Sequence, residues 1–385
     1  MRFIHTADWQ IGKSFRRYGE REDQLKRARL DAIERIGALA MAQNAPFVMV
    51  AGDVYDHFAP AQRTANEPLE RMRAYPGVNW LLLPGNHDPH RPDAIWDRLM
   101  RGGLPVNVKP LLSPGVIELA SVSQSGAGVC LLPAPLLRNS ETADLTAWMD
   151  AAPTPPGAIR LGLAHGSVTG FSDEQAQSNP IDPARAKSAG LAYLALGDWH
   201  RTMKINERTW YSGTHEPDRA GGQKTGQALL VDVASPNATP IVTPHDVGLY
   251  RWESREMDLR GASLDDVETS LRALPDLPRT LLRLTCTGVL PLAARADLER
   301  RLELLQAAFF HLELDLDSLA AQPSDEDLET LDFDGVLRKS ADMLRAQAGD
   351  VNLDAAGRRI ASDALVELFL ISQNMRKASP AEEAS

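Results

Sequence analysis

The stretch FIHTADWQIG, residues 3–12, begins like a buried strand and ends in polar side chains. Phe3 and Ile4 are typical of a strand, whereas Asp8 and Gln10 are not. Four further stretches follow an apolar run in the same way: AGDVYD (51–56), PGNHDPH (84–90), LAHGS (163–167) and LGDWHR (196–201). Functional groups of an α/β sheet gather beyond the carboxyl ends of its strands. The five stretches therefore predict one shared site.

The first part of the chain alternates short apolar runs with helical patterns, which predicts an α/β sheet domain over residues 1–245. A long helix is expected at 22–43, with its apolar side chains on one broad face. Loops are expected at 153–157 and 235–244, where Pro and Gly are frequent. Strands are expected at 2–6, 47–51, 80–83, 129–132, 159–164, 193–196 and 228–233.

The pattern changes after residue 245, where a small α+β domain is predicted over 246–322. Its expected strands are 250–259, 280–287 and 309–316, and its expected helices are 264–274 and 292–305. A helical region is predicted over 323–376, with helices at 333–346 and 354–371 after the acidic linker 324–329. The tail, residues 377–385, is expected to be disordered.

Composition and charge limit the classes of function. The 385 residues include 41 Lys and Arg and 52 Asp and Glu, and nearly all of the excess acid lies after residue 250. Proteins that handle DNA usually carry a basic surface, so the net charge of −11 argues mildly against DNA. Cys130 and Cys286 are too far apart in sequence for a disulfide framework or a zinc knuckle. Both stand in strand-like apolar runs, so we expect both to be buried.

The expected location is a reducing cytoplasm, since only two cysteines are present. No apolar run approaches the roughly 18 residues that a membrane span needs, so no membrane association is expected. Met1 leads directly into a strand-like run, so we expect no signal peptide.

The polar residues at the five strand ends can all bind metal. They are Asp8, Gln10, Asp53, Asn86, His165, Asp198 and His200. A pair of divalent cations needs a carboxylate between them and donors on both sides. Mixed oxygen and nitrogen donors suit Mn²⁺, Fe²⁺ or Zn²⁺. Each stretch alone is more often a polar turn or a structural histidine, but five in succession are hard to explain in that way.

At these residues the sequence resembles the calcineurin-like metallophosphoesterases, and within them the DNA-repair exonuclease branch of the SbcD type. That branch has Asp-x-His, Gly-Asp, Gly-Asn-His-Asp, His-Gly and Gly-His-x-His in this order. The stretches HTADWQIG, AGDVYDHFAP, LLLPGNHDPH, LAHGSV and LALGDWHR follow the same order, and WYSGTHEPD (210–218) resembles the strand and turn that come next. The resemblance implies a β-sandwich flanked by helices, a small α+β capping domain and a C-terminal helical pair.

The resemblance also implies a role for each site residue. Asp53 would bridge two divalent ions, and His87 would protonate the leaving oxygen or stabilise charge in the transition state. One metal position would comprise Asp8, Gln10 and His200, and the other Asn86, His165 and Asp198. The implied activity is that of a DNA exonuclease in double-strand break repair, with endonuclease activity as a second option and with hydroxide attack on phosphorus. The implied assembly is a homodimer whose terminal helices bind an SMC-like, SbcC-like coiled-coil ATPase.

Two residues depart from the family pattern, because Gln10 and Asp198 stand where relatives have His. A decayed or weak site is one interpretation. The other is a tuned site, because an amide oxygen and a carboxylate both bind metal. The site then has more oxygen ligands and fewer nitrogen ligands than its relatives. Such a set of hard donors favours Mn²⁺, with Mg²⁺ as a further candidate, over Zn²⁺. The additional carboxylate makes the attacking water less acidic, so we expect an alkaline optimum.

Several nearby residues have weaker assignments. Lys13, Arg16 and Arg17 precede the long helix and are candidates for contact with a nucleic-acid backbone, whereas residues 26–29 are expected to form a solvated helix face. Asp56 is a candidate for orienting a ligand and His215 for lining the site. Trp9 and Trp199 are expected to serve in packing.

Two rival functions remain open. One is hydrolysis of a small phosphodiester, such as a cyclic nucleotide or a nucleotide-linked lipid precursor, because site chemistry is shared across many substrates. The other is an inactive or weakly active scaffold for an ATPase, which the departures at Gln10 and Asp198 keep open. The capping domain and helical pair favour DNA and a partner over a small substrate.

Overall fold

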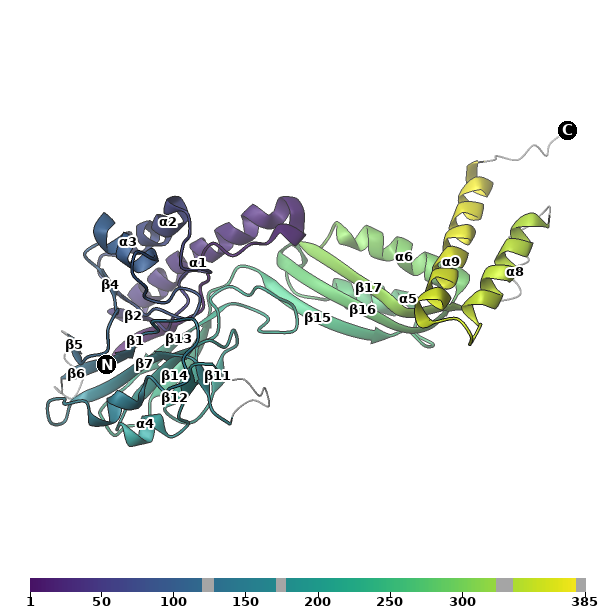
Figure 1. Ribbon diagram of the computed structural model, residues 1–385. Helices are drawn as coiled ribbons and strands as arrows, with labels where there is room; N and C mark the ends of the chain where they lie inside the picture. Colours follow the sequence, from purple (N-terminus) through teal and green to yellow (C-terminus); the bar gives the residue numbers. More distant parts are fainter. Residues whose placement is uncertain (120–127, 171–177, 323–334, 379–385) are drawn as a thin grey trace. The chain divides into compact units, whose positions relative to one another are not determined.

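The computed structural model describes residues 1–119, 128–170, 178–322 and 335–378 (Figure 1). The chain divides into two compact units, Met1–Trp252 and Glu253–Ser385. The predicted acidic linker at 324–329 and the predicted tail from residue 379 onward lie outside the described residues. The finer predicted division at residues 322 and 376 stays a prediction.

The first unit contains two six-stranded sheets. The first sheet, in the order β14-β13-β1-β2-β3-β4, contains β1 (Arg2–Thr6), β2 (Phe47–Val50), β3 (Asn79–Leu82), β4 (Val108–Pro110), β13 (Gln227–Asp232) and β14 (Ile241–Asp246). The second sheet, in the order β11-β12-β10-β7-β6-β5, contains β5 (Ile117–Leu119), β6 (Val129–Ala134), β7 (Ile159–His165), β10 (Tyr193–Gly197), β11 (Met203–Lys204) and β12 (Thr209–Tyr211). Strands β1 to β4 are parallel, as are β6, β7, β10 and β12, so their carboxyl ends share one edge in each sheet.

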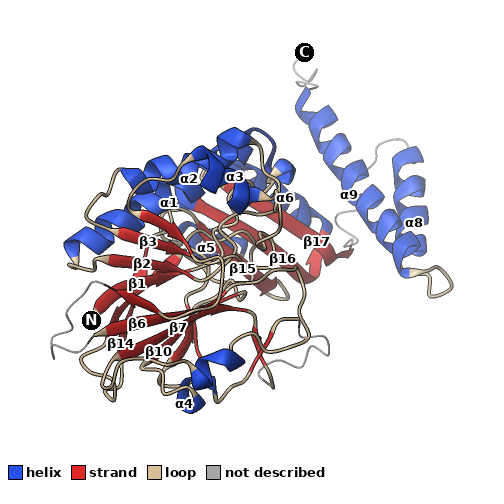
Figure 2. Ribbon diagram, turned by 60° about the vertical axis from the view of Figure 1, so that its left-hand side comes forward, coloured by secondary structure: helices blue, strands red, loops and turns tan. Residues whose placement is uncertain are grey.

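Alternating side chains create the layers of this unit, because successive residues of a strand point to opposite faces. Phe3 and Met49 of the first sheet share a buried cluster with Leu161 of the second, so the two sheets pack face to face. Ile4 and Val48 instead pack with the helices α1 (Glu22–Ala42), α2 (Gln62–Arg73) and α3 (Ile95–Gly102). Figure 2 shows these helices over the outer face of the first sheet. The predicted β-sandwich flanked by helices is confirmed.

One predicted loop is wrong. Residues 241–244 of the predicted loop 235–244 belong to β14, which pairs antiparallel with β13 along its whole length. Because β14 is an edge strand, its side chains are mostly exposed and it tolerates Pro244. An exposed strand with a proline lacks the apolar alternation on which strand prediction depends.

The second unit is a three-stranded sheet, ordered β15-β16-β17, with helices. Its strands are β15 (Arg251–Asp258), β16 (Thr280–Pro291) and β17 (His311–Gln322), and its helices are α5 (Leu264–Arg272), α6 (Leu292–Gln306), α8 (Val336–Ala348) and α9 (Ala355–Ala378). Strands β16 and β17 are parallel, and α6 makes the crossover between them. Helices α8 and α9 meet α6 in a small apolar cluster that includes Ala341, Leu365 and Leu292.

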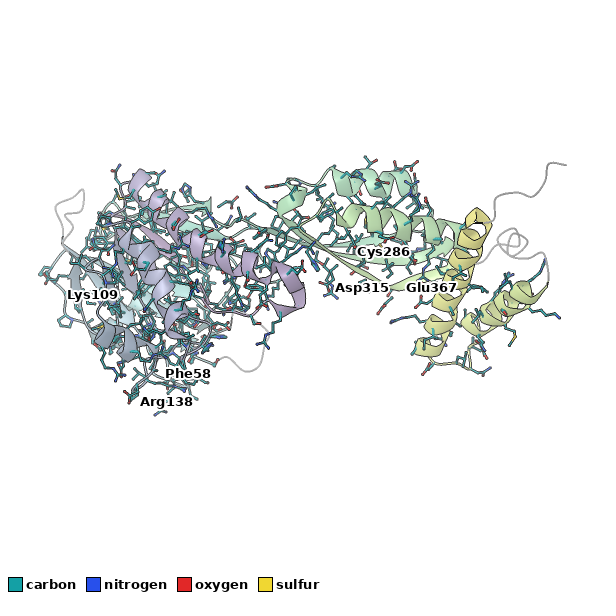
Figure 3. All side chains as sticks on the ribbon, turned by 90° about the horizontal axis from the view of Figure 1, so that it is seen from above. Phe58, Lys109, Arg138, Cys286, Asp315 and Glu367 are labelled. Atoms are coloured by element: carbon teal, nitrogen blue, oxygen red, sulfur yellow. The ribbon has the colours of Figure 1, made fainter. Side chains whose placement is uncertain are left out.

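Both cysteines are buried and free, as expected. Figure 3 labels Cys286 and Asp315 among the side chains of the second unit. Burial and, to a smaller extent, the charge of Asp315 raise the pKa of Cys286 to about 11, so its thiol stays un-ionised. Among the described helices, none is both long enough and apolar enough to cross a membrane.

Candidate metal centre

The loops after β1 and β2 lie side by side because their strands are parallel neighbours. The backbone N–H of Asp8 donates to Gly52 O at 3.1 Å, and that of Gln10 donates to Asp53 O at 2.8 Å. Asp8, Gln10 and Asp53 have φ angles of 54°, 41° and 54°, a left-handed conformation that L-residues adopt at a cost. Strained backbone clusters at functional sites when the surrounding structure holds it in place. The hydrogen bonds of Asp8 N and Gln10 N hold the backbone of this loop in the left-handed conformation.

The second sheet reaches these loops through His165, the last residue of β7. Its Nδ1 lies 2.8 Å from Ala51 O, so Nδ1–H donates to this carbonyl and Nε2 faces the site. Gly52 has a φ of +90°, and a Cβ atom there would lie 2.1 Å from His165 Nδ1. Only glycine therefore allows the two sheets to approach so closely at their carboxyl ends.

Asp8, Asp53 and His165 form the core of the site. Each offers a ligand atom, these atoms lie within 4.8 Å of one another, and all three residues are buried. Burial raises the pKa of Asp8 to about 6, although the histidines His200 and His165 pull it down. Burial lowers the pKa of His165, but Asp53, Asp8 and Asp198 outweigh it and raise the pKa to about 9.

The core residues fit a divalent cation. A buried cluster of carboxylates is unfavourable unless positive charge compensates it. The only hydrogen bonds to the Asp8 carboxylate that we find among the described residues come from the backbone N–H of Asp198, at 3.1 and 3.3 Å. Carboxylate oxygens and an imidazole nitrogen at this spacing are ordinary ligands of a divalent metal, which would take the place of the proton on His165 Nε2.

Asn86 and Asp198 complete one side of the site. Asn86 Oδ1 lies 2.7 Å and Asp198 Oδ1 lies 3.8 Å from His165 Nε2. Ser167 donates a hydrogen bond of 2.7 Å to the other Asp198 oxygen and so orients the carboxylate. The structure thus brings Asn86, His165 and Asp198 together around one nitrogen atom.

His87 lies at the open side of the site, with 41% of its side chain exposed. Its backbone N–H donates to Asp53 Oδ1 at 2.9 Å, and its Nδ1–H donates to Asp56 O at 2.9 Å. Nε2 consequently lies on the side of Asp53, 3.9 Å from Oδ2. Asp56 orients His87 through its main-chain carbonyl, a contact that sequence reasoning could not assign.

Asp88 is a site residue that sequence reasoning missed, although it is the last residue of the Gly-Asn-His-Asp motif. One of its oxygens accepts from Gly85 N at 2.7 Å and the other from Tyr55 N at 3.1 Å. The buried carboxylate therefore ties the loop of Asn86 to the loop of Asp53. Burial and the nearby charge of Asp53 raise the pKa of Asp88 to about 7.

The other side of the site is a closed ring of four side chains. Lys13 Nζ lies 2.7 Å from Gln10 Oε1 and 2.7 Å from Asp218 Oδ2. Gln10 Nε2 lies 3.2 Å from His200 Nε2, and His200 Nδ1 lies 3.2 Å from the same Asp218 oxygen. Burial alone would raise the pKa of Asp218, but His200, Arg29 and Lys13 hold it well below its usual range. Asp218 was missed although it ends the stretch WYSGTHEPD (210–218), because nothing in that stretch marks it as a partner of Lys13 near the start of the chain.

Arg29 corrects the predicted solvated face at residues 26–29, because its side chain is buried. It donates to Trp9 O at 2.9 Å, to Glu216 O at 2.8 Å and to Asp8 O at 3.3 Å. The position four residues after Leu25 places Arg29 on the buried face of α1, a signal that could have found it.

His215 is also buried and donates from Nε2 to Arg29 O at 2.8 Å, so it supports the loop from within. Trp9 is buried against His215 and Trp80, which confirms its expected packing role. Trp199 is half-buried and packs beside Tyr211.

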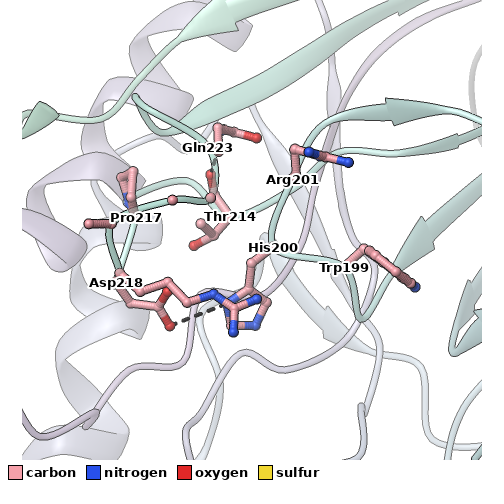
Figure 4. Close-up of a pocket in the computed structure, with 11 residues that line it drawn as sticks. Trp199, His200, Arg201, Thr214, Pro217, Asp218 and Gln223 are labelled. Carbon is pink, nitrogen blue, oxygen red and sulfur yellow. Dashed lines mark hydrogen bonds and ion pairs between the residues drawn. The ribbon is translucent and has the colours of Figure 1, made fainter. Parts of the chain in front are cut away.

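A pocket of about 280 Å³ opens beside His200 and Asp218. Figure 4 shows their ion pair and the neighbouring side chains of Trp199 and Arg201. The lining residues are Trp199, His200, Arg201, Thr214, Pro217, Asp218, Arg219, Ala220, Gly221, Gly222 and Gln223.

Arg16 and Arg17 lie exposed in the 3-10 helix Arg16–Arg21, where Arg17 stacks on Tyr18 at 4.7 Å.

Comparison with known proteins gives a consistent result for the first unit. Residues 1–179 match the family model described as calcineurin-like phosphoesterase. The chain is 29% identical to the SbcD component of the SbcCD nuclease of Rhodobacter capsulatus over 328 residues, which cover 72% of this chain and 78% of that protein. It is 25% identical to the corresponding component of the SbcCD nuclease of Bacillus subtilis over 245 residues, 56% of this chain and 61% of that protein.

A solved structure, that of the Thermus thermophilus protein TT1561, is similar with a TM-score of 0.39 and 13% identity. The similarity covers 64% of this chain and 98% of that one. Similarity at this level adds nothing to the assignment of the site.

Proposed function

Since residues 1–179 of this chain are a calcineurin-like phosphoesterase domain, we propose that the protein is a metal-dependent DNA phosphodiesterase. Calcineurin-like phosphoesterases hydrolyse phosphoesters at a site that holds divalent metal ions. The finer proposal is exonuclease activity, with endonuclease activity as a second option, in the repair of DNA double-strand breaks. Similarity to components of two nucleases supports this proposal.

One observation carries the proposal: the buried cluster of Asp8, Asp53 and His165 where the strands of two sheets end. We propose that these residues would hold two divalent ions: Asp53 would contribute to both, Asp8, Gln10 and His200 to one, and Asn86, His165 and Asp198 to the other. When bound, divalent ions polarise the phosphate and make the attacking water more acidic.

His87 is proposed to assist departure of the leaving group. Because Nδ1–H is held by Asp56 O, Nε2 carries the lone pair in the neutral ring and faces the site. After Nε2 gains a proton, the ring can donate it to the leaving oxygen and offset the charge of the phosphate. Nε2 lies 3.9 Å from Asp53 Oδ2, within reach of the proposed metal centre.

The second unit supports the proposal of a partner. Helices α8 and α9 expose large apolar side chains, among them Met343 at 66%, Ile360 at 68% and Ile371 at 54%. Exposed apolar side chains on neighbouring helices are typical of an interaction surface. We propose that these helices bind an SMC-like, SbcC-like coiled-coil ATPase, that the assembly is a homodimer, and that it acts in the cytoplasm, where free cysteines stay reduced.

A cleavage assay on linear duplex DNA tests the function. Purified protein with Mn²⁺ is incubated with end-labelled DNA, with a cyclic nucleotide and with bis(p-nitrophenyl) phosphate. We expect release of nucleotides from DNA. Hydrolysis of the small substrates without DNA cleavage would instead identify a small-molecule phosphodiesterase. Hydrolysis of neither, with or without a copurified ATPase, would identify a scaffold.

Metal preference provides a second prediction. With Gln10 and Asp198 the donors are mostly oxygen, so Mn²⁺ should support faster cleavage than Zn²⁺, with Mg²⁺ as a weaker alternative. The carboxylate of Asp198 adds negative charge beside the ions and disfavours ionisation of the attacking water. The rate should therefore still rise between pH 7 and about pH 9. Tightly held zinc with full zinc-supported turnover at neutral pH would refute this prediction.

The exposed arginines before α1 provide a third prediction. If Arg16 and Arg17 contact DNA phosphates, changing both to Ala should weaken binding to all sequences alike. The slope of log K against log salt is negative, and its magnitude should fall by about 1 to 2, since each lost phosphate contact removes about 0.9. Arg63→Ala is a matched control, because its side chain is 90% exposed on α2. An unchanged slope in the double variant would exclude the contact.

A further inference from the structure

The ring of Lys13, Gln10, His200 and Asp218 lies on one side of the proposed metal centre. It closes through four contacts of 2.7 to 3.2 Å. Lys13 lies only partly exposed, at 27% of its side chain, and Asp218 at 6%. The ring is therefore a built feature of the site rather than a set of mobile surface charges.

Lys13 determines the orientation of the Gln10 amide. An ammonium group carries three donors and no acceptor, so the Gln10 atom that faces it at 2.7 Å must be the amide oxygen. The amide NH₂ consequently faces His200 Nε2, at 3.2 Å. In this orientation Gln10 presents hydrogen atoms, and no lone pair, to the site.

The contact between Gln10 Nε2 and His200 Nε2 also occupies the lone pair of His200. A nitrogen that faces an amide N–H must accept, so His200 Nε2 carries its lone pair toward Gln10, and Nδ1–H donates to Asp218. That lone pair is the one a metal ion would need. Gln10 and His200 therefore satisfy each other as long as Lys13 holds the amide oxygen.

The opposite side of the site contains no ammonium group, and its side chains are held by the hydrogen bond from His165 Nε2 to Asn86 Oδ1, at 2.7 Å. Asn86 Oδ1 and Asp198 Oδ1 both face His165 Nε2, and none of the described lysine and arginine side chains pairs with Asn86, Asp198 or His165. The Asp8 and Asp53 carboxylates complete its donors. A cation can enter here with no ammonium group to displace.

We propose that Lys13 is an internal cation that competes with metal at the position of Gln10 and His200, so that the two positions fill in sequence with unequal affinity. The ion beside Asn86 and His165 binds first. The second ion binds only after the Gln10 amide releases Lys13 and turns its oxygen inward. This inference rests on the proposed metal-dependent function, but metal binding alone can test it.

The test is a titration of metal-free protein with Mn²⁺, in which electron paramagnetic resonance counts free Mn²⁺ and detects exchange-coupled Mn²⁺ pairs. Wild type should bind one ion tightly and a second at least about tenfold more weakly. Lys13→Met keeps the length of the side chain and removes its charge. It should tighten the second site about tenfold or more and produce the coupled signal at lower Mn²⁺, with the first site unchanged.

Lys26→Met is the matched control, because Lys26 pairs with Glu22 at 2.7 Å on α1 and lies outside the ring. If Lys13→Met unfolds, Lys13→Leu is the second variant, since it also removes the charge, adds no metal ligand and should tighten the same site. Two equal sites in wild type, or equal effects of Lys13→Met and Lys26→Met, would overturn the inference. Absence of any Mn²⁺ binding to wild type would instead overturn the proposed function itself.

Discussion

Changing Asp53 to Asn is expected to lower phosphodiester cleavage by roughly three orders of magnitude, because several kcal/mol of transition-state stabilisation depends on the bound ions. Asp53 is 2% exposed and belongs to the buried cluster with Asp8 and His165. The amide keeps the size of the side chain and can still accept from His87 N, which lies 2.9 Å from Oδ1. The rate is measured on labelled DNA with saturating Mn²⁺.

The fold of this variant should be retained. Removing one of several buried negative charges relieves repulsion, so the melting temperature should stay the same or rise. Asp93→Asn is the matched control, because Asp93 is 84% exposed and pairs with Arg101. Wild-type turnover by Asp53→Asn would show that cleavage takes place elsewhere.

Changing Arg29 to Met is expected to destabilise the protein by about 3–5 kcal/mol, the usual cost of removing one member of a buried charged network. The guanidinium group is buried and bridges Trp9 O and Asp8 O on one segment to Glu216 O on another. These carbonyl groups would remain buried without their donor. Urea unfolding, followed by tryptophan fluorescence, measures the loss.

The matched control is Arg27→Met on the same helix, where the side chain is exposed and the expected change is within about 0.5 kcal/mol. Equal stability of the two variants would contradict the structural role of Arg29. The Arg29 variant should also bind metal more weakly, since the loop of Asp8 loses its anchor. That second effect distinguishes a support of the site from a general contribution to the core.

The fold of the first unit was largely predictable because its central strands are short apolar runs buried on both faces. This signal is local, so β1, β2, β7 and β10 lie within one residue of their expected ends. Edge strand β14 lacks the signal, because it is exposed and contains Pro244. Helix α2 was not predicted either, since it is polar and contains Pro68.

The placement of the motif residues side by side was predictable because each stands at or shortly after the end of a strand, and parallel strands bring such positions together. The residues that support the site from behind were not predictable. Arg29 contacts residues 187 positions away, and Asp218 closes a ring with Lys13 from the far end of the unit. Such contacts depend on the whole fold and leave no periodic trace in the sequence. The ligand role of Gln10 stays a prediction, whereas its hydrogen bond from Lys13 has no counterpart in the sequence pattern.

Anomalous diffraction from crystals grown with Mn²⁺ tests the central claim most directly. We expect a strong peak within bonding distance of Asp8, Asp53 or His165, and a weaker peak, or none at low Mn²⁺, beside Gln10 and His200. Density for Mn²⁺ only at other places, with Asp8, Asp53 and His165 free of metal at saturating Mn²⁺, would contradict the account.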